Sequence, residues 1–316
     1  MEATAVRPAP KKVNKTLNYY KRYWTLYLLL ALPVAFFIIF RYFPMAYVMI
    51  AFKKYNITQS IWVMPWAKNF GFEYFIKAFA NRDFIYAIRN TLLLNGLDLI
   101  IGFPAPIILA ILLNELVFQK FKRFTQTVAY MPHFLSWVII NGLVLQLLGP
   151  TNGLVNILIN KMGFETVPFI NNPTNWVFTY IFVGIWQSIG WNTIIYMASI
   201  AGINTELYEA ASVDGAGRLR KIWNITLPGL RSTIVVLLLL NVGNILGGGF
   251  ERPYALMNNL VASVANVIPI FVYNNGIRSM QFSLTTAVGL FQSVVCVIFL
   301  VASNALAEKF GERGVL

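Results

Sequence analysis

Residues 206–230 read ELYEAASVDGAGRLRKIWNITLPGL and stand between two long apolar runs. The stretch carries six charged side chains, whereas only 12% of the 316 residues are charged and 58% are hydrophobic. Soluble domains carry about 25% charged residues, so the composition of the whole chain is typical of a membrane protein. A charged, glycine-containing segment in such a chain therefore needs an explanation of its own.

The segment is predicted to fold as a helix, a break and a second helix. Thr205 is expected to cap the first helix, because its hydroxyl can accept a hydrogen bond from a free N–H of the first turn. Asp214 and Gly215 signal the break, and the second helical stretch is expected over residues 216–225. Leu227-Pro228 then opens the next apolar run, since proline is tolerated in a first helical turn.

Six apolar runs are long enough to cross a bilayer, which takes about 20 residues in a helix. They are residues 24–44, 88–113, 125–148, 176–201, 228–247 and 284–306. The predicted fold is an all-α integral membrane protein with six transmembrane helices. Residues 206–230 lie between the fourth and the fifth.

Lysine and arginine in the connections predict the orientation of the chain. With the N-terminus inside, the inner connections hold 14 of these residues and the outer ones eight. This excess places both termini and residues 206–230 in the cytoplasm of a multi-pass protein of the cell membrane. The same distribution explains the net charge of +13 without nucleic-acid binding. The first apolar run is too long for a signal peptide and no small-residue cleavage site follows it, so a retained first helix is predicted.

The spacing of residues in the charged segment is specific. Glu209-Ala210-Ala211 is followed by Gly215 and then by Ile225-x-Leu227-Pro228. This sequence resembles the EAA loop of binding-protein-dependent ABC importer permeases, whose pattern EAA-x3-G-x9-I-x-LP is met at every position. The stretches NVGNILGGGFE and AYVMIAFKKYN are similar to the sugar-permease branch, which serves oligosaccharide importers.

The resemblance implies a transport subunit and not an enzyme. In this family the loop forms a coupling helix between the fourth and fifth spans, where Glu209 would contact a cytoplasmic ATPase, Ala210 and Ala211 would permit close approach, and Gly215 would make the bend. The implied ATPase-coupling loop comprises Glu209, Ala210, Ala211, Asp214, Gly215, Ile225, Leu227 and Pro228. The implied partners are a second homologous permease, two cytoplasmic ABC ATPase subunits, an extracytoplasmic solute-binding protein and membrane lipid, with no nucleic acid.

ATP and Mg²⁺ would bind to the partner ATPases, because this chain has no phosphate-binding G-x-x-x-x-G-K-[ST] loop. No cofactor or metal is expected in the chain itself. Residues 88–306 look like the transmembrane domain of the family, preceded by a cytoplasmic segment (1–23) and by the first helix with its outer loop (24–87). Residues 307–316 form a cytoplasmic tail.

Polar residues within the spans are the candidates for a solute path, because such groups usually face the bundle or a water-filled cavity. The candidates are Gln187, Ser188, Trp191, Asn192, Tyr196, Asn241, Asn244 and Gln292. Amides, hydroxyls and rings suit a neutral sugar, so a sugar or oligosaccharide is the expected cargo. Small polar residues also join transmembrane helices, and this alternative stays open for each candidate.

Three other functions remain to be weighed. An ABC permease for an amino acid or a peptide would have much the same loop. A membrane-bound polysaccharide enzyme would need a cluster of acids, bases or metal ligands, which is not found. A secondary transporter would more often show a chain of intramembrane ionisable residues. Asp98 and Glu115, placed near span ends, and His133 form no such chain.

Overall fold

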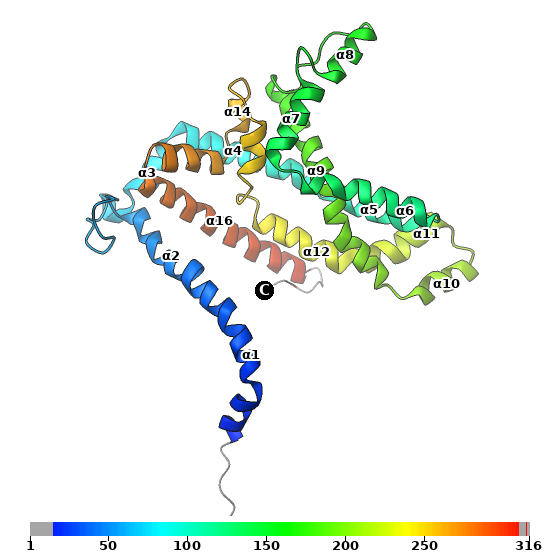
Figure 1. Cartoon of the computed structure of the whole chain (residues 1–316), viewed down its shortest axis with the longest axis horizontal. Coiled ribbons are helices and arrows are strands. Elements are labelled where there is room, and N and C mark those ends of the chain that lie inside the picture. Colours follow the sequence, from blue (N-terminus) through cyan, green and yellow to red (C-terminus); the bar gives the residue numbers. More distant parts are fainter. Residues whose placement is uncertain (1–14, 310–313, 315–316) are drawn as a thin grey trace, which may run out of the picture.

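The computed structural model describes residues 15–309 and 314, which are largely helical (Figure 1). The α-helices are α1 (Lys15–Phe37), α2 (Phe43–Met45), α3 (Glu73–Ala80), α4 (Arg82–Leu97), α5 (Pro104–Glu115), α6 (Gln119–Tyr130), α7 (Trp137–Leu148), α8 (Leu154–Lys161), α9 (Pro173–Ala201), α10 (Thr205–Val213), α11 (Arg218–Lys221), α12 (Leu227–Gly243), α13 (Glu251–Leu256), α14 (Ala262–Ala265), α15 (Ile268–Val272) and α16 (Phe282–Lys309). Short 3₁₀ or π segments continue or join them: η1 (Ile38–Tyr42), η2 (Ala46–Phe52), η3 (Asn69–Gly71), η4 (Asp98–Gly102), η5 (Met131–Phe134), η6 (Ile222–Thr226) and η7 (Tyr273–Arg278). The described residues contain no strand beyond one isolated bridge, so the predicted all-α class is confirmed.

Four continuous helical stretches are long and apolar enough to cross a bilayer. They are Arg22–Phe52, Arg82–Glu115, Arg218–Gly243 and Phe282–Lys309. A fifth candidate is the bent pair that α6, η5 and α7 form. Helix α9 has 29 residues, about 44 Å at 1.5 Å per residue, but its polar side chains lower its hydropathy.

The third predicted span is not one straight helix. The axes of Gln119–Phe134 and Trp137–Leu148 differ by 107°, so the prediction of a single helix over 125–148 is wrong. Pro132 lacks the N–H that would continue the helix beyond Tyr130. Ser136 then caps α7, because its hydroxyl accepts a hydrogen bond from the N–H of Ile139.

Prolines explain where the other spans change their winding. The π segments η1, η4 and η6 each end two residues before a proline: Pro44, Pro104 and Pro228. A proline ring clashes with the carbonyl four residues earlier and removes one helical hydrogen bond. A wider π turn accommodates this clash while the helix continues. The three spans therefore run through their prolines without ending.

The charged segment begins and breaks close to where it was predicted to. Helix α10 is capped by Asn204, whose side chain accepts from the N–H of Glu206, so the expected cap at Thr205 is wrong by one residue. The break is confirmed at Gly215, which has φ of +74°. The next helix starts at Arg218 and continues through η6 into α12, so the fifth span does not begin at Leu227-Pro228.

Helix α9 organises the core. Trp176, Tyr180 and Ile181 belong to a buried cluster with residues of α4, α7 and the segments around α13 and α14. Trp176 is 1% exposed and donates from Nε1 to the carbonyl of Leu256 at 2.8 Å. Further along α9, Tyr196 and Ile200 form a second cluster with α5 and α12. The segment 251–265 is therefore fixed against the spans.

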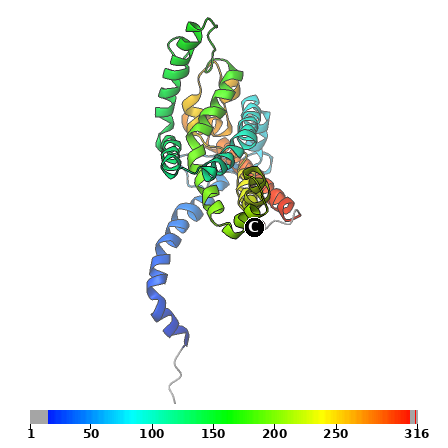
Figure 2. The ribbon, with the colours of Figure 1, turned by 90° about the vertical axis from the view of Figure 1, so that its right-hand side faces the viewer.

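The elements separate towards two ends of the molecule. Helices α8 and α14 lie at the top of Figure 1, whereas α10 and the end of α16 lie in the lower half (Figure 1). Figure 2 shows the same separation, with α1 descending below the bundle (Figure 2). The apolar window of Arg22–Phe52 has none of its residues buried in this chain, so α1 offers its surface to lipid or to another protein.

The contact between α6 and α9 depends on Gly190. A methyl group at this position would overlap the backbone carbonyl of Ala129, so Gly190→Ala must push the two helices apart. Such overpacking costs about 1–3 kcal/mol, and we expect a lower midpoint of thermal unfolding for the purified protein. Gly142→Ala in α7 is the matched control, because nothing lies within 4 Å of its new methyl. Equal midpoints for both variants would contradict this packing.

Candidate functional site

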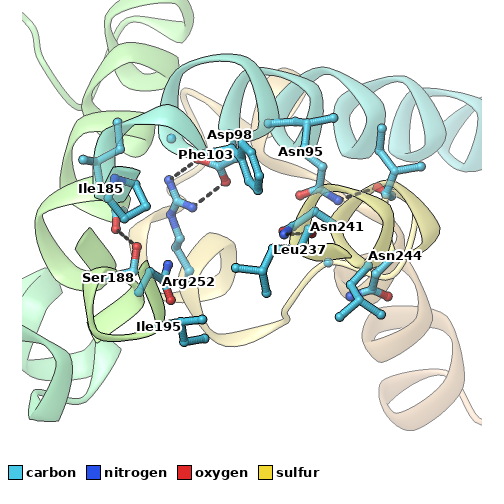
Figure 3. A pocket seen from close by; sticks show the side chains of 18 of the residues that line it. Asn95, Asp98, Phe103, Ile185, Ser188, Ile195, Leu237, Asn241, Asn244 and Arg252 are labelled. Atoms are coloured by element: carbon cyan, nitrogen blue, oxygen red, sulfur yellow. Dashed lines mark hydrogen bonds and ion pairs between the residues drawn. The ribbon is translucent and has the colours of Figure 1, made fainter. Parts of the chain in front are cut away.

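A polar cavity of about 410 Å³ lies between the α4–η4–α5 span, α9, α12 and α13 (Figure 3). Its walls hold apolar side chains such as Phe103 and Ile195 together with several polar ones. The polar lining consists of Asn95, Asp98, Ser188, Asn192, Tyr196, Asn241, Asn244 and Arg252. Three spans and one outer segment, far apart in the sequence, thus contribute to one site.

Five of the eight predicted solute-path residues line this cavity. They are Ser188, Asn192, Tyr196, Asn241 and Asn244. Asn192 and Asn244 are exposed, and neither amide has a hydrogen-bond partner among the described residues. Asn241 is also exposed, although its amide donates to the carbonyl of Leu237 at 2.7 Å. These amides leave donors and acceptors available to a solute.

The other three candidates lie elsewhere. Gln187 donates to the carbonyl of His133 at 3.4 Å, and Trp191 stacks on the His133 ring with centroids 4.6 Å apart. Both therefore join α9 to the bend between α6 and α7. Gln292 lies half-buried on α16, outside the cavity. Ser199, which shares the predicted polar face of α9, is hydrogen-bonded to Thr233 of α12 at 2.9 Å.

An ion pair in the cavity wall was not predicted from the sequence. Arg252 Nη1 donates to Asp98 Oδ2 at 2.7 Å (Figure 3). Nη2 donates to the backbone carbonyl of Tyr180. Asp98 does not lie near a span end as expected, but midway along Arg82–Glu115. Arg252 lies in residues 248–283, a connection that the sequence predicts to be on the outer side, yet only 15% of its side chain is exposed. The sequence did contain one signal: Asp98 is a single acidic residue within an apolar run, which indicates that a basic partner is needed.

The residues of the predicted coupling loop lie on α10, directly after it, or at the start of the following span. Glu209, Ala210, Asp214 and Gly215 are exposed, and Ala211 is half-buried. Of the remaining loop residues, Ile225 lies in η6, and Leu227 and Pro228 begin α12.

Two hydrogen bonds join α10 to the fifth span. Tyr208 shares a hydrogen bond of 3.0 Å with Thr226, and Lys221 Nζ donates to Ser212 Oγ at 2.6 Å. Helix α10 thus presents an exposed face while remaining fixed to the span that lines the cavity.

Comparison with known proteins identifies the family. Residues 102–311, more than half of the chain, match the model of the binding-protein-dependent transport system inner membrane component. The chain belongs to this family. It is a permease subunit, which carries out transport and is not an enzyme, and it is a multi-pass membrane protein.

Similar proteins cover almost the whole permease. Protein LplB of Bacillus subtilis is 44% identical over 93% of this chain and 92% of that protein. The polygalacturonan/rhamnogalacturonan transport system permease protein YteP of the same organism is 44% identical over 92% and 89%. A chain in the crystal structure of a bacterial alginate ABC transporter, in complex with an alginate pentasaccharide-bound periplasmic protein, superimposes with a TM-score of 0.85. It is 38% identical and covers 94% of this permease and 99% of that chain.

The water-filled character of the cavity can be tested with single cysteines in a Cys296→Ser background. We expect Asn192→Cys and Asn244→Cys to react with a charged, membrane-impermeant thiol reagent, because both positions face the cavity. Thr193→Cys, next to Asn192 but fully buried, is the matched control and should stay unlabelled. The measurement is the labelled fraction by mass spectrometry. Equal labelling at positions 192 and 193 would contradict the assignment.

Proposed function

We propose that this permease is one of the membrane subunits of an ATP-driven, binding-protein-dependent ABC importer for an oligosaccharide. The cavity between α4, α9 and α12 forms part of the solute path, and α10 receives the cytoplasmic ATPase. The observation that carries the proposal is the EAA pattern on an exposed helix that is hydrogen-bonded to a cavity-lining span.

The nature of the cargo is supported by the relatives and by the lining. YteP is named for the transport of polygalacturonan and rhamnogalacturonan, AraP of Bacillus subtilis is named for arabinooligosaccharides, and the solved transporter is an alginate transporter. These relatives support a saccharide cargo but differ in its charge. Sugars present many hydroxyl groups, which hydrogen-bond well with amides. Asn192, Asn241 and Asn244 supply such amides in the cavity.

The coupling role of α10 follows from its attachment. An ATPase that moves α10 also moves the start of α12, because the Tyr208–Thr226 and Lys221–Ser212 hydrogen bonds join the two. Rigid-body displacement of packed elements is a recognised switching device. ATP and Mg²⁺ bind to the partner ATPases, and their hydrolysis cycle alternates the access of the cavity. No cofactor is assigned to this chain.

The complete importer contains a second homologous permease, two ATPase subunits and an extracytoplasmic solute-binding protein. The unburied surface of Arg22–Phe52 is suited to a second permease or to lipid. Six spans are assigned when α9 and the bent pair α6–α7 are each counted as one, with residues 88–306 as the transmembrane domain. Both termini and α10 are then cytoplasmic, and the binding protein docks at the end of α8 and α14.

The coupling assignment predicts that Gly215→Val uncouples the importer. Valine is strained at φ of +74°, so the turn after α10 must change even though its Cβ has open space. We expect uptake per ATP hydrolysed to fall by about tenfold, which corresponds to about 1.4 kcal/mol of lost docking or alignment. The measurement is cargo uptake and ATP hydrolysis by the complex in proteoliposomes.

Gly163→Val is the matched control for this strain. Gly163 has φ of +83° and open space around its Cβ, but lies in the loop after α8 at the other end of the chain's fold (Figure 1). This variant should retain normal coupling. Glu209→Lys, which reverses the charge on the exposed face of α10, should act like Gly215→Val. Normal assembly and uptake in both α10 variants would contradict the coupling role.

A further inference from the structure

The two side chains of the ion pair in the cavity wall differ in their exposure to solvent. The Asp98 side chain is 31% exposed, whereas that of its partner Arg252 is only 15% exposed. We propose that Asp98 is the acceptor subsite for hydroxyl groups of a neutral sugar residue and that Arg252 is its positioning residue. This inference rests on the proposed function, because it specifies which oligosaccharides the cavity accepts.

The carboxylate has acceptor capacity to spare. Its two oxygens offer about four lone-pair sites in total. Arg252 donates to Oδ2 at 2.7 Å and to Oδ1 at a long 3.4 Å, and these are the hydrogen bonds of the carboxylate within the described residues. Hydrogen bonds from hydroxyl groups to a charged oxygen are stronger than neutral ones. Asp98 is therefore the strongest acceptor that the cavity presents.

The two Nη groups of Arg252 are already committed to the protein, whereas its buried Nε has no partner among the described residues. Nη2 donates to the carbonyl of Tyr180, and the guanidinium carbon lies 3.6 Å from the centre of the Tyr180 ring. Gly184 on α9 creates the space for it, because a methyl there would overlap the guanidinium. Arg252 is thus packed between Asp98 and α9. Its role is to hold the carboxylate in place.

The charge balance of the cavity favours a neutral ligand. Asp98 and Arg252 are the charged residues of the lining and cancel each other. The carboxylate of a uronate would face the more exposed Asp98, while the cationic group is buried behind it. Like charges repel each other, so a uronate is disfavoured beside Asp98. A neutral sugar meets no such repulsion, and the amides on α9 and α12 bind its remaining hydroxyl groups.

The test compares two tetrasaccharides that differ at C6, a neutral galactose tetramer and a galacturonate tetramer. Binding to the purified permease–ATPase complex is measured by saturation-transfer NMR without the binding protein, so that the cavity alone selects. The wild-type complex should bind the neutral tetramer about tenfold more tightly, as expected for one charge-assisted hydrogen bond. The galacturonate tetramer binding as tightly or more tightly would overturn the inference.

The double variant Asp98→Asn/Arg252→Gln separates binding from folding. Its amides restore a neutral hydrogen-bonded pair, and its assembly is checked by ATPase co-purification and thermal unfolding. We expect it to bind the neutral tetramer about tenfold more weakly, because its acceptor is uncharged. A merely structural ion pair would leave this affinity unchanged. Gly184→Ala, which displaces Arg252, should also weaken binding, whereas the control Gly142→Ala should not.

The same preparations distinguish this inference from the function on which it rests. Uptake of a mixed oligosaccharide pool into proteoliposomes is followed by mass spectrometry. If the wild-type complex imports oligosaccharides but binds neither tetramer, or if the double variant binds like the wild type, the Asp98 subsite is wrong and the importer function stands. If no oligosaccharide is imported with ATP, the proposed function is wrong as well.

Discussion

The ion pair between Asp98 and Arg252 is the interaction on which the cavity depends. It joins the middle of the α4–α5 span to α13, and the Tyr180 carbonyl adds α9 to the same junction. Removing one member of this partly buried pair would leave the other charge without compensation. The outer segment that carries Arg252 is therefore held against the spans. This segment closes one side of the cavity.

Proline and glycine determine how the spans surround that junction. The π segment η4 begins at Asp98 and ends before Pro104, so the acid stands where the helix is widened. Gly184 leaves space on α9 for the guanidinium. Beside α10, η6 carries the span past Pro228 without a break, which makes one helix from Arg218 to Gly243. A displacement of α10 can thus reach Asn241 and Asn244 through one continuous element.

Much of this architecture can be predicted from local sequence. Apolar length locates the helices α4–α5, α9, α12 and α16, and the spacing around Gly215 locates the exposed α10 with its break. Five of eight polar candidates reach the cavity, because residues three or four apart share one helix face. The break in the third span was not predicted, because proline is tolerated in many membrane helices. The presence of Pro132 alone does not tell whether the helix is kinked or ends there.

Contacts between residues that are far apart in the sequence could not be predicted from local sequence patterns. Asp98 and Arg252 are 154 residues apart, and Arg252 stands in a stretch with the composition of an outer loop. A local pattern carries no information about which segment folds back onto which span. The same limit applies to Gln187 and Trp191, which were candidates for the solute path but contact the bend near His133. Tertiary packing decided which polar residues join helices and which face the cavity.

An electron cryomicroscopy structure of the assembled importer, with a neutral oligosaccharide trapped during turnover, would test whether Asp98 holds the cargo. We predict density for a sugar residue within hydrogen-bond distance of an Asp98 oxygen, with Asn192 or Asn244 contacting the same sugar and α10 seated on the ATPase. A trapped sugar remote from Asp98, in a cavity formed by other spans, would contradict the account.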